Sequence, residues 1–210
     1  MTAAQRCALA LVLPLWAAGS AALAADVNAG RVKAQACVVC HGEGGRSSNP
    51  AVPSLAAQPP LYIYYQLLQF RDERRKSPAM SPAAVGMKDA EMRDLAAYFA
   101  AEAPARNKEA DKQADKQADK QATKPEALAA AEKIARQYYC ASCHMPDYSG
   151  QKHIARLAGL NSEYLARQLR GFRNGERPDI DGTMASAAQP LSDQDIELLA
   201  NYLAAFELPQ

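Results

Sequence analysis

The 210-residue sequence has little of what a membrane-spanning, nucleic-acid-binding or β-sheet protein needs. After residue 24 it has no apolar run near the roughly 20 residues that cross a bilayer. Lysine and arginine number 24 against 23 aspartates and glutamates, so no basic excess is present to neutralise nucleic-acid phosphates. No segment alternates convincingly between apolar and polar residues as a half-buried strand does. These absences favour an all-α protein without a nucleic-acid partner.

Residues 1–24 have the pattern of a secretory signal peptide. Arg6 is their only charged residue, an apolar stretch covers residues 8–18, and Ala22-Leu23-Ala24 fits a small-residue cleavage site. The apolar stretch is about half the length of a spanning helix, which favours a cleaved signal over a membrane anchor. We therefore expect a mature chain that starts near Ala25 in the bacterial periplasm.

Four of the five cysteines lie in two matching frames, Cys37-Val38-Val39-Cys40-His41 and Cys140-Ala141-Ser142-Cys143-His144. The Cys-x-x-Cys-His frame is the signature of covalent c-type haem attachment. Two thiols one helical turn apart reach the two vinyl groups of a haem, and the histidine meets its iron. A disulfide within each pair, or one zinc ion shared by both, is the other use of such cysteines. Two frames in an exported chain favour two covalently bound haem c groups.

The frames belong to an internal repeat of the chain. Six residues recur with an offset of 102: Leu55, Tyr62, Gln66, Leu67, Phe70 and Arg71 match Leu157, Tyr164, Gln168, Leu169, Phe172 and Arg173. Between the repeats Ala-Asp-Lys-Gln occurs three times from residue 110, a tract that cannot bury a core and is expected to be solvated. The predicted organisation is a signal at 1–24, a domain at 25–104, a linker at 105–125 and a second domain at 126–210.

Helical spacing of apolar residues recurs in both halves. The predicted helices cover 26–36, 60–75 and 88–101 in the first half, and 125–139, 161–173 and 192–207 in the second. Ser192, with Asp195 three residues later, resembles an acidic helix cap. Each half is therefore expected to be a small all-α domain.

A second axial iron ligand has to face the histidine from a distant segment. The candidates are Met80, Met87, Met92, Met145, Met184 and His153. Met145 directly follows His144, and Met87 and Met92 lie at the start of a predicted helix, where methionine often fills a core. Met80 and Met184 each lie in a predicted loop, seven residues before a position that is apolar in both halves. We predict Met80 and Met184 as the ligands, since His153 has no counterpart in the first half.

With these motifs the sequence resembles the dihaem cytochrome c4 family, which consists of duplicated class I c-type cytochromes. The resemblance covers nearly all of the expected mature chain except the linker. Besides the haem frames it rests on Pro53-Ser54-Leu55-Ala56-Ala57-Gln58, on Gly171-Phe172-Arg173-Asn174-Gly175-Glu176-Arg177 and on the placement of Met80 and Met184. It implies two tandem class I cytochrome c domains, with Cys37, Cys40, Cys140 and Cys143 as thioether anchors, His41 and His144 as proximal ligands, and Met80 and Met184 as distal ligands.

The resemblance also implies a function. A six-coordinate His/Met iron has no open position for a small-molecule substrate and suits an electron carrier better than an enzyme. The expected role is a periplasmic electron carrier in a respiratory chain. It docks transiently to a quinol-oxidising complex and to a terminal oxidase, and this docking can take place at a membrane surface. The alternatives are a dihaem subunit of a dehydrogenase or flavocytochrome complex, or a dihaem peroxidase, which needs an accessible iron.

Three features of this chain depart from the family pattern. The linker is longer than the usual connection. A proline carbonyl orients the proximal imidazole in the family; Pro53 matches it, but Ala155 takes its place in the second half, so the second imidazole is expected to be held less firmly. Met145 follows the second haem frame at the position that Gly42 takes after the first frame.

The arginine-rich stretches 71–76 and 167–177 have three open roles, which are partner docking, propionate binding and solvated helix faces.

Overall fold

The computed structural model describes residues 25–104 and 124–206. The predicted signal peptide and residues 105–123 of the predicted linker lie outside this part of the chain. Within it the secondary structure is helical, with one isolated β-bridge between Gln151 and Ile154 and no strand, which confirms the all-α prediction. None of the described helices is long and apolar enough to cross a membrane.

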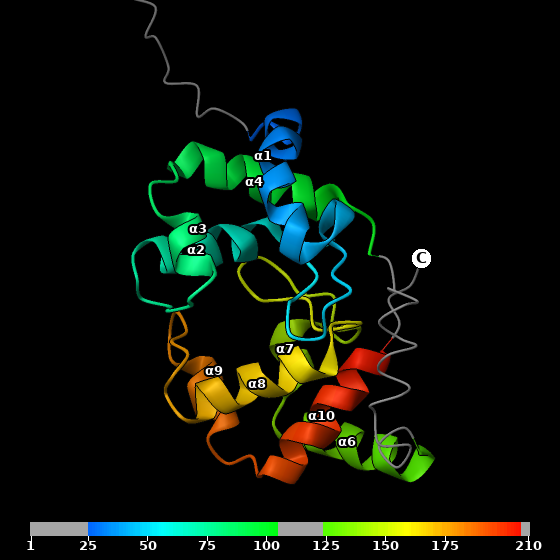
Figure 1. Ribbon diagram of the computed structural model, residues 1–210. Helices are drawn as coiled ribbons and strands as arrows, with labels where there is room; N and C mark the ends of the chain where they lie inside the picture. Colours follow the sequence, from blue (N-terminus) through cyan, green and yellow to red (C-terminus); the bar gives the residue numbers. More distant parts are fainter. Residues whose placement is uncertain (1–24, 105–123, 207–210) are drawn as a thin grey trace, which may run out of the picture.

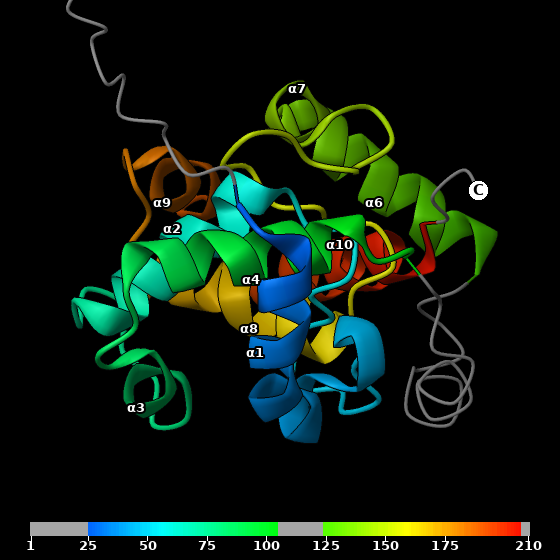
Figure 2. The same ribbon diagram turned by 90° about the horizontal axis from the view of Figure 1, so that it is seen from above.

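The first half is a small bundle of helices (Figures 1 and 2). Its elements are α1 (Val27–His41), the 3-10 helix η1 (Glu43–Gly45), α2 (Pro60–Arg71), α3 (Met80–Ala84) and α4 (Asp89–Ala101). The carboxylate of Asp26 caps α1 by accepting hydrogen bonds from the backbone of Asn28 and Ala29. Helix α1 crosses α4 so closely that a Cβ on Gly30 would lie 2.0 Å from the carbonyl oxygen of Asp94. Glycine at this position therefore allows the crossing.

The second half repeats this arrangement. Its elements are α6 (Pro125–Gln137), α7 (Cys140–His144), α8 (Ser162–Arg173), α9 (Thr183–Ala188) and α10 (Asp193–Ala205). The hydroxyl of Ser192 accepts from the backbone of Asp195 at 3.1 Å, and the Asp195 carboxylate accepts from the Ser192 backbone at 2.9 Å, which confirms the predicted cap. Helix α6 begins at Pro125, inside the predicted linker, and the predicted domain limits stay predictions.

Several predicted helix ends were wrong for local reasons. The first helix runs to His41 instead of stopping at Ala36, because the haem frame continues the helix. In the second half the corresponding helix breaks, since Tyr139 has φ 54° and separates α6 from α7. Helix α2 ends at Arg71 and not at Arg75, because Glu73 turns the chain with φ 52°.

Each half has its own apolar core. The first core includes Ile63, Leu95 and Phe99 between α2 and α4, and the second includes Tyr164, Ile196 and Leu199 between α8 and α10. Helices α1 and α6 close the two cores by packing on α4 and α10. In each half this packing places the loop that follows the haem frame on the side that faces the other half (Figure 1).

Polar groups join the two halves. The amide of Gln58 donates to the carbonyl oxygen of Arg156 at 3.0 Å and accepts from the backbone N–H of Arg156 at the same distance. The buried guanidinium of Arg156 donates to the carbonyl oxygen of Ala56 at 2.9 Å. The side chain of Asn161 donates to the carbonyl oxygens of Asn49 and Val52. The two halves therefore meet through satisfied backbone groups rather than through apolar contact alone.

Candidate haem sites

The first candidate site is built on the end of α1. Cys37 and Cys40 lie one turn apart on this helix, and His41 is its last residue. The buried imidazole of His41 donates from Nδ1 to the carbonyl oxygen of Pro53 at 2.9 Å. This hydrogen bond orients the ring and leaves Nε2 to bind a metal.

The second candidate site repeats this geometry on α7, which carries Cys140, Cys143 and His144. The buried imidazole of His144 donates from Nδ1 to the carbonyl oxygen of Ala155 at 2.8 Å. Since the bonds at Pro53 and Ala155 have nearly the same length, the expected looser hold on the second imidazole is not seen in the bond length. The greater rigidity of the proline stays a prediction.

Burial sets the protonation of these groups. It lowers the pKa of His41 and His144, which favours the neutral imidazoles that bind metals. It raises the pKa of the Cys37 and Cys140 thiols, because an apolar environment disfavours a thiolate. A thioether bond to a haem carries no charge and suits the same environment.

The other uses of the cysteine frames have no support in the described part of the chain. All four cysteines are free of disulfide bonds, and Cys40 and Cys143 are exposed. Over the described ranges no three His, Cys, Asp or Glu side chains are grouped to hold a metal ion. A zinc site shared between the two frames is therefore not formed.

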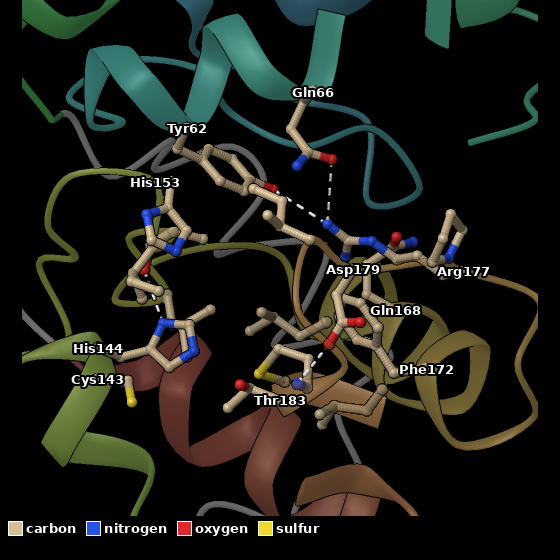
Figure 3. Close-up of a pocket in the computed structure, with 18 of the residues that line it drawn as sticks. Tyr62, Gln66, Cys143, His144, His153, Gln168, Phe172, Arg177, Asp179 and Thr183 are labelled. Carbon is tan, nitrogen blue, oxygen red and sulfur yellow. Dashed lines mark hydrogen bonds between the residues drawn. The ribbon is translucent and has the colours of Figure 1, made fainter. Parts of the chain in front are cut away.

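A cavity of about 330 Å³ opens beside His144 (Figure 3). Its walls are mostly apolar and include Leu157, Leu160 and Leu169, and Met184 also lines it. The labelled polar side chains Tyr62, Gln66 and Arg177 lie away from Cys143 in Figure 3. An apolar macrocycle with two carboxylates on one edge fits such a cavity, so the residues present fit a haem.

The predicted methionine ligands lie at the starts of two short helices. Met80 is the first residue of α3 and Met184 the second of α9, so the prediction that both lie in loops is wrong. The backbone N–H of Met80 donates to Ser77 Oγ at 3.2 Å, and that of Met184 donates to Asp179 Oδ2 at 2.5 Å. Met80 packs against the same core as Cys37, and Met184 packs against the other core with Cys140. Each methionine thus shares a core with one haem frame.

The other candidate ligands have separate places. Met92 is fully buried and Met87 packs against the same core, which confirms the prediction that they fill space. Met145 caps α7 on the side of His144. His153 lines the cavity of the second half and its ring meets the ring of Tyr65 edge-on, with 6.4 Å between centroids.

Sequence reasoning missed the contact between Gln58 and Arg156. The available signal was the charged residue Arg156 itself, which precedes the apolar pair Leu157-Ala158 at a position where the first half has Ser54. It did not reveal the partner, which lies 98 residues away along the chain.

Comparisons with known proteins agree with this geometry. The family model for cytochrome c matches residues 27–102 and 128–206. Cytochrome c4 of Pseudomonas aeruginosa is 34% identical over 200 residues, which cover 93% of this chain and 96% of that protein. The chain belongs to the dihaem cytochrome c4 family. Membership gives it two covalently bound haem c groups and makes it an electron-transfer protein rather than an enzyme.

A solved structure and a further relative are also similar to this chain. The crystal structure of reduced recombinant cytochrome c4 from Pseudomonas stutzeri superposes with a TM-score of 0.75 at 27% identity, covering 88% of this chain and 100% of that one. The thiosulfate dehydrogenase electron acceptor of Thiomonas intermedia is 30% identical, with 82% of this chain and 79% of that protein covered. The structural likeness confirms two cytochrome c domains, and electron carriers of this kind exchange electrons with other redox proteins.

Proposed function

We propose that this cytochrome carries electrons in the periplasm from a quinol-oxidising complex towards a terminal oxidase. His41 and Met80 ligate one iron, and His144 and Met184 ligate the other. The observation that carries this assignment is the cavity of the second half, which is lined by both His144 and Met184 and is otherwise largely apolar. The bound haem supplies an iron that exchanges one electron between its ferric and ferrous states.

The residues of the chain do three things for this function. The carbonyl oxygens of Pro53 and Ala155 hold the two imidazoles in the tautomer that keeps the proton on Nδ1. The side chains of Ser77 and Asp179 hold the backbone at the starts of α3 and α9, which carry the methionines. The apolar walls of the cavity in the second half exclude water around His144. Fixed ligands in a dry site favour electron exchange without rearrangement.

A spectral titration of the purified holoprotein tests the assignment. We expect two haems per chain, both low-spin, and both with the band that marks thioether-to-iron ligation when oxidised. Met80→Ala and Met184→Ala should each remove this band from one haem. Met87→Leu is the matched control, because Met87 lies seven residues after Met80 and packs against the core. A high-spin haem in the wild-type protein, or an unchanged band in either alanine variant, contradicts the assignment.

The direction of electron flow needs a separate test. A quinol-oxidising complex should reduce the oxidised cytochrome, and a terminal oxidase should reoxidise it, each at rates that depend on salt concentration. A cytochrome that neither complex turns over is not a carrier between them.

A second candidate function is the electron-accepting partner of a dehydrogenase. The observation that favours it is the likeness to the thiosulfate dehydrogenase electron acceptor. In that case the chain co-purifies from its native periplasm with a catalytic subunit, and thiosulfate reduces the complex but not the cytochrome alone. Rapid turnover of peroxide by the reduced cytochrome would contradict both functions, since it requires an open iron position.

A further inference from the structure

The imidazole of His144 is hydrogen-bonded to a peptide group that the first half also contacts. His144 donates from Nδ1 to the carbonyl oxygen of Ala155 at 2.8 Å, the bond drawn as the dashed line at His144 in Figure 3. The N–H of Arg156 belongs to the same planar peptide group as that carbonyl. It donates to Oε1 of Gln58 at 3.0 Å. One peptide group therefore lies between His144 and an amide of the opposite half.

The amide of Gln58 is fixed by two hydrogen bonds to Arg156. Its Oε1 accepts from the backbone N–H, and its Nε2 donates to the backbone carbonyl oxygen, both at 3.0 Å. A backbone N–H only donates and a carbonyl oxygen only accepts, so the orientation of the amide is determined. Both side chains are almost fully buried, with 2% of Gln58 and 3% of Arg156 exposed. Burial removes water as a competing partner, so the two bonds hold the backbone at Arg156 in place.

Hydrogen bonds in such a series strengthen one another. When the Arg156 N–H donates to Gln58, electron density shifts towards the carbonyl oxygen of the same peptide group. That oxygen becomes a better acceptor for the Nδ1–H of His144. A stronger hydrogen bond at Nδ1 makes Nε2 a better donor to a metal and fixes the orientation of the ring. Gln58 thus acts on His144 through one peptide group, without contact between the two side chains.

The first half holds the corresponding loop with its own residues. His41 donates from Nδ1 to the carbonyl oxygen of Pro53, whose ring restricts the backbone at that point. The hydroxyl of the next residue, Ser54, accepts from the backbone N–H of Ser47 at 3.1 Å. The second half has an alanine in place of the proline and an arginine in place of Ser54, so it lacks both of these constraints. Its hydrogen bond at Ala155 is nevertheless as short as the one at Pro53.

We propose that Gln58 of the first half is a positioning residue for His144, so that docking of the two halves completes the haem site of the second half. This inference rests on the proposed function, since it takes His144 as an iron ligand. The dependence runs in one direction. The contact from the Arg156 guanidinium meets the carbonyl oxygen of Ala56, which lies three residues after Pro53 and not in its peptide group.

The test compares Gln58→Leu with the wild-type holoprotein, because leucine removes both polar atoms of the amide at a similar side-chain size. The Nδ1–H protons of His41 and His144 are followed by proton–nitrogen NMR of the reduced protein, and their exchange with deuterium is timed. In Gln58→Leu the His144 proton should exchange about tenfold faster, the effect of losing about one net hydrogen bond. The His41 proton should keep its wild-type rate.

A redox titration gives a second measurement, in which each haem is followed by the proton NMR signals of its methyl groups. A weaker hydrogen bond at Nδ1 makes His144 a poorer donor to ferric iron. The equilibrium constant for reduction of the second haem should therefore rise about threefold in Gln58→Leu, which is about 30 mV for a one-electron couple. The first haem should keep its potential.

Asn161→Ala is the matched control. The Asn161 side chain also makes two hydrogen bonds across the interface, to the carbonyl oxygens of Asn49 and Val52, but neither involves the peptide group bonded to His144. This variant should leave the His144 proton and both potentials unchanged. The same change in Asn161→Ala as in Gln58→Leu would show a general loosening of the interface and would overturn the positioning role.

Gln58→Glu separates the hydrogen bonds from packing. Its carboxylate still accepts from the Arg156 N–H but cannot donate to the carbonyl oxygen, so the slow exchange of the His144 proton should return. Equally fast exchange in Gln58→Glu and Gln58→Leu would mean that an acceptor at this position does not hold the peptide group, and the inference would fail.

Haem content and the low-spin spectrum keep this test separate from that of the proposed function. A wild-type protein without two low-spin haems contradicts the proposed function. Two low-spin haems with an unchanged His144 proton and unchanged potentials in Gln58→Leu leave that function intact and overturn the positioning role. Equal changes at both haems overturn it too. Where Gln58→Leu does not assemble with two haems, Gln58→Met decides by the same measurements, since methionine keeps the unbranched shape of glutamine.

Discussion

Replacing Met145 by glycine should relieve backbone strain in the second half of the protein. Met145 follows the second haem frame with φ 72° and ψ 156°. The first half has Gly42 at this position with φ 77° and ψ 167°. This backbone region is almost confined to glycine, and a residue with a side chain costs about 1–3 kcal/mol there. The second half therefore stores strain beside His144 that the first half lacks.

The size of the gain follows from two opposing terms. Relief of the strain contributes about 1–3 kcal/mol, and the extra freedom of glycine in the unfolded chain costs about 0.5–1 kcal/mol. Since the Met145 side chain is partly buried, Met145→Ala is the reference that removes its packing and keeps the strain. Met145→Gly should be more stable than Met145→Ala by about 1 kcal/mol. At an ordinary helix position the glycine variant is instead less stable than the alanine variant.

Guanidinium unfolding of the oxidised holoprotein, followed by far-ultraviolet circular dichroism, measures this difference. Ala130→Gly, at an exposed position of α6, is the matched control and should lose about 1 kcal/mol. Gly42→Ala is the reverse test, because its Cβ would lie 2.0 Å from the carbonyl oxygen of Arg46, and it should destabilise the first half. If Met145→Gly is no more stable than Met145→Ala, the backbone at this position is not strained and the reasoning fails.

Three other changes have calculable outcomes. Gln58→Ala leaves the buried backbone groups of Arg156 without partners and should lower the free energy of unfolding by about 1–3 kcal/mol, measured by guanidinium titration. Asp179→Asn removes a negative charge at the start of α9 and should raise the potential of the second haem by about 30 mV, a threefold change, in a redox titration. The hydrogen bond from Arg173 holds the pKa of Asp193 below its usual range in the folded protein. The stability from this pair is therefore present above the usual pKa of an aspartate and is lost as the pH falls through the lowered pKa. The melting temperature should therefore fall between about pH 5 and pH 2, and less steeply in Arg173→Gln.

The parts that could be predicted from the sequence are those whose chemistry is local. Cys37, Cys40 and His41 lie within five residues, and the thiol spacing needed for one haem is visible in the chain itself. The long helices were found because their apolar residues repeat over three turns or more. Helices α3 and α9 have five and six residues, too few for a period to appear. The sequence pattern therefore predicts loops at both positions.

The interface between the halves could not be predicted, since its partners are distant in the chain. Arg177 and Gln66 are 111 residues apart, and nothing local distinguishes Arg177 from Arg173 four positions earlier. One arginine meets an aspartate of its own half and the other meets the opposite half only after both halves have folded and docked. Sequence reasoning therefore left open whether these arginines form solvated faces, docking patches or propionate contacts.

The hydrogen bonds that the side chains of Gln58 and Arg156 make across the interface make the two halves non-equivalent. The repeat aligns Gln58 with Leu160 and Arg156 with Ser54, so at the equivalent contact a leucine side chain would face the backbone of a serine. Leu160 is buried in the core of its own half and cannot supply the amide that Gln58 provides. A chain made of two second halves would lack the glutamine, and a chain made of two first halves would lack the guanidinium that donates to the carbonyl oxygen of Ala56. Each half therefore supplies the interface with a side chain that the other half lacks at the equivalent position, so a copy of one half does not reproduce the contacts of the other.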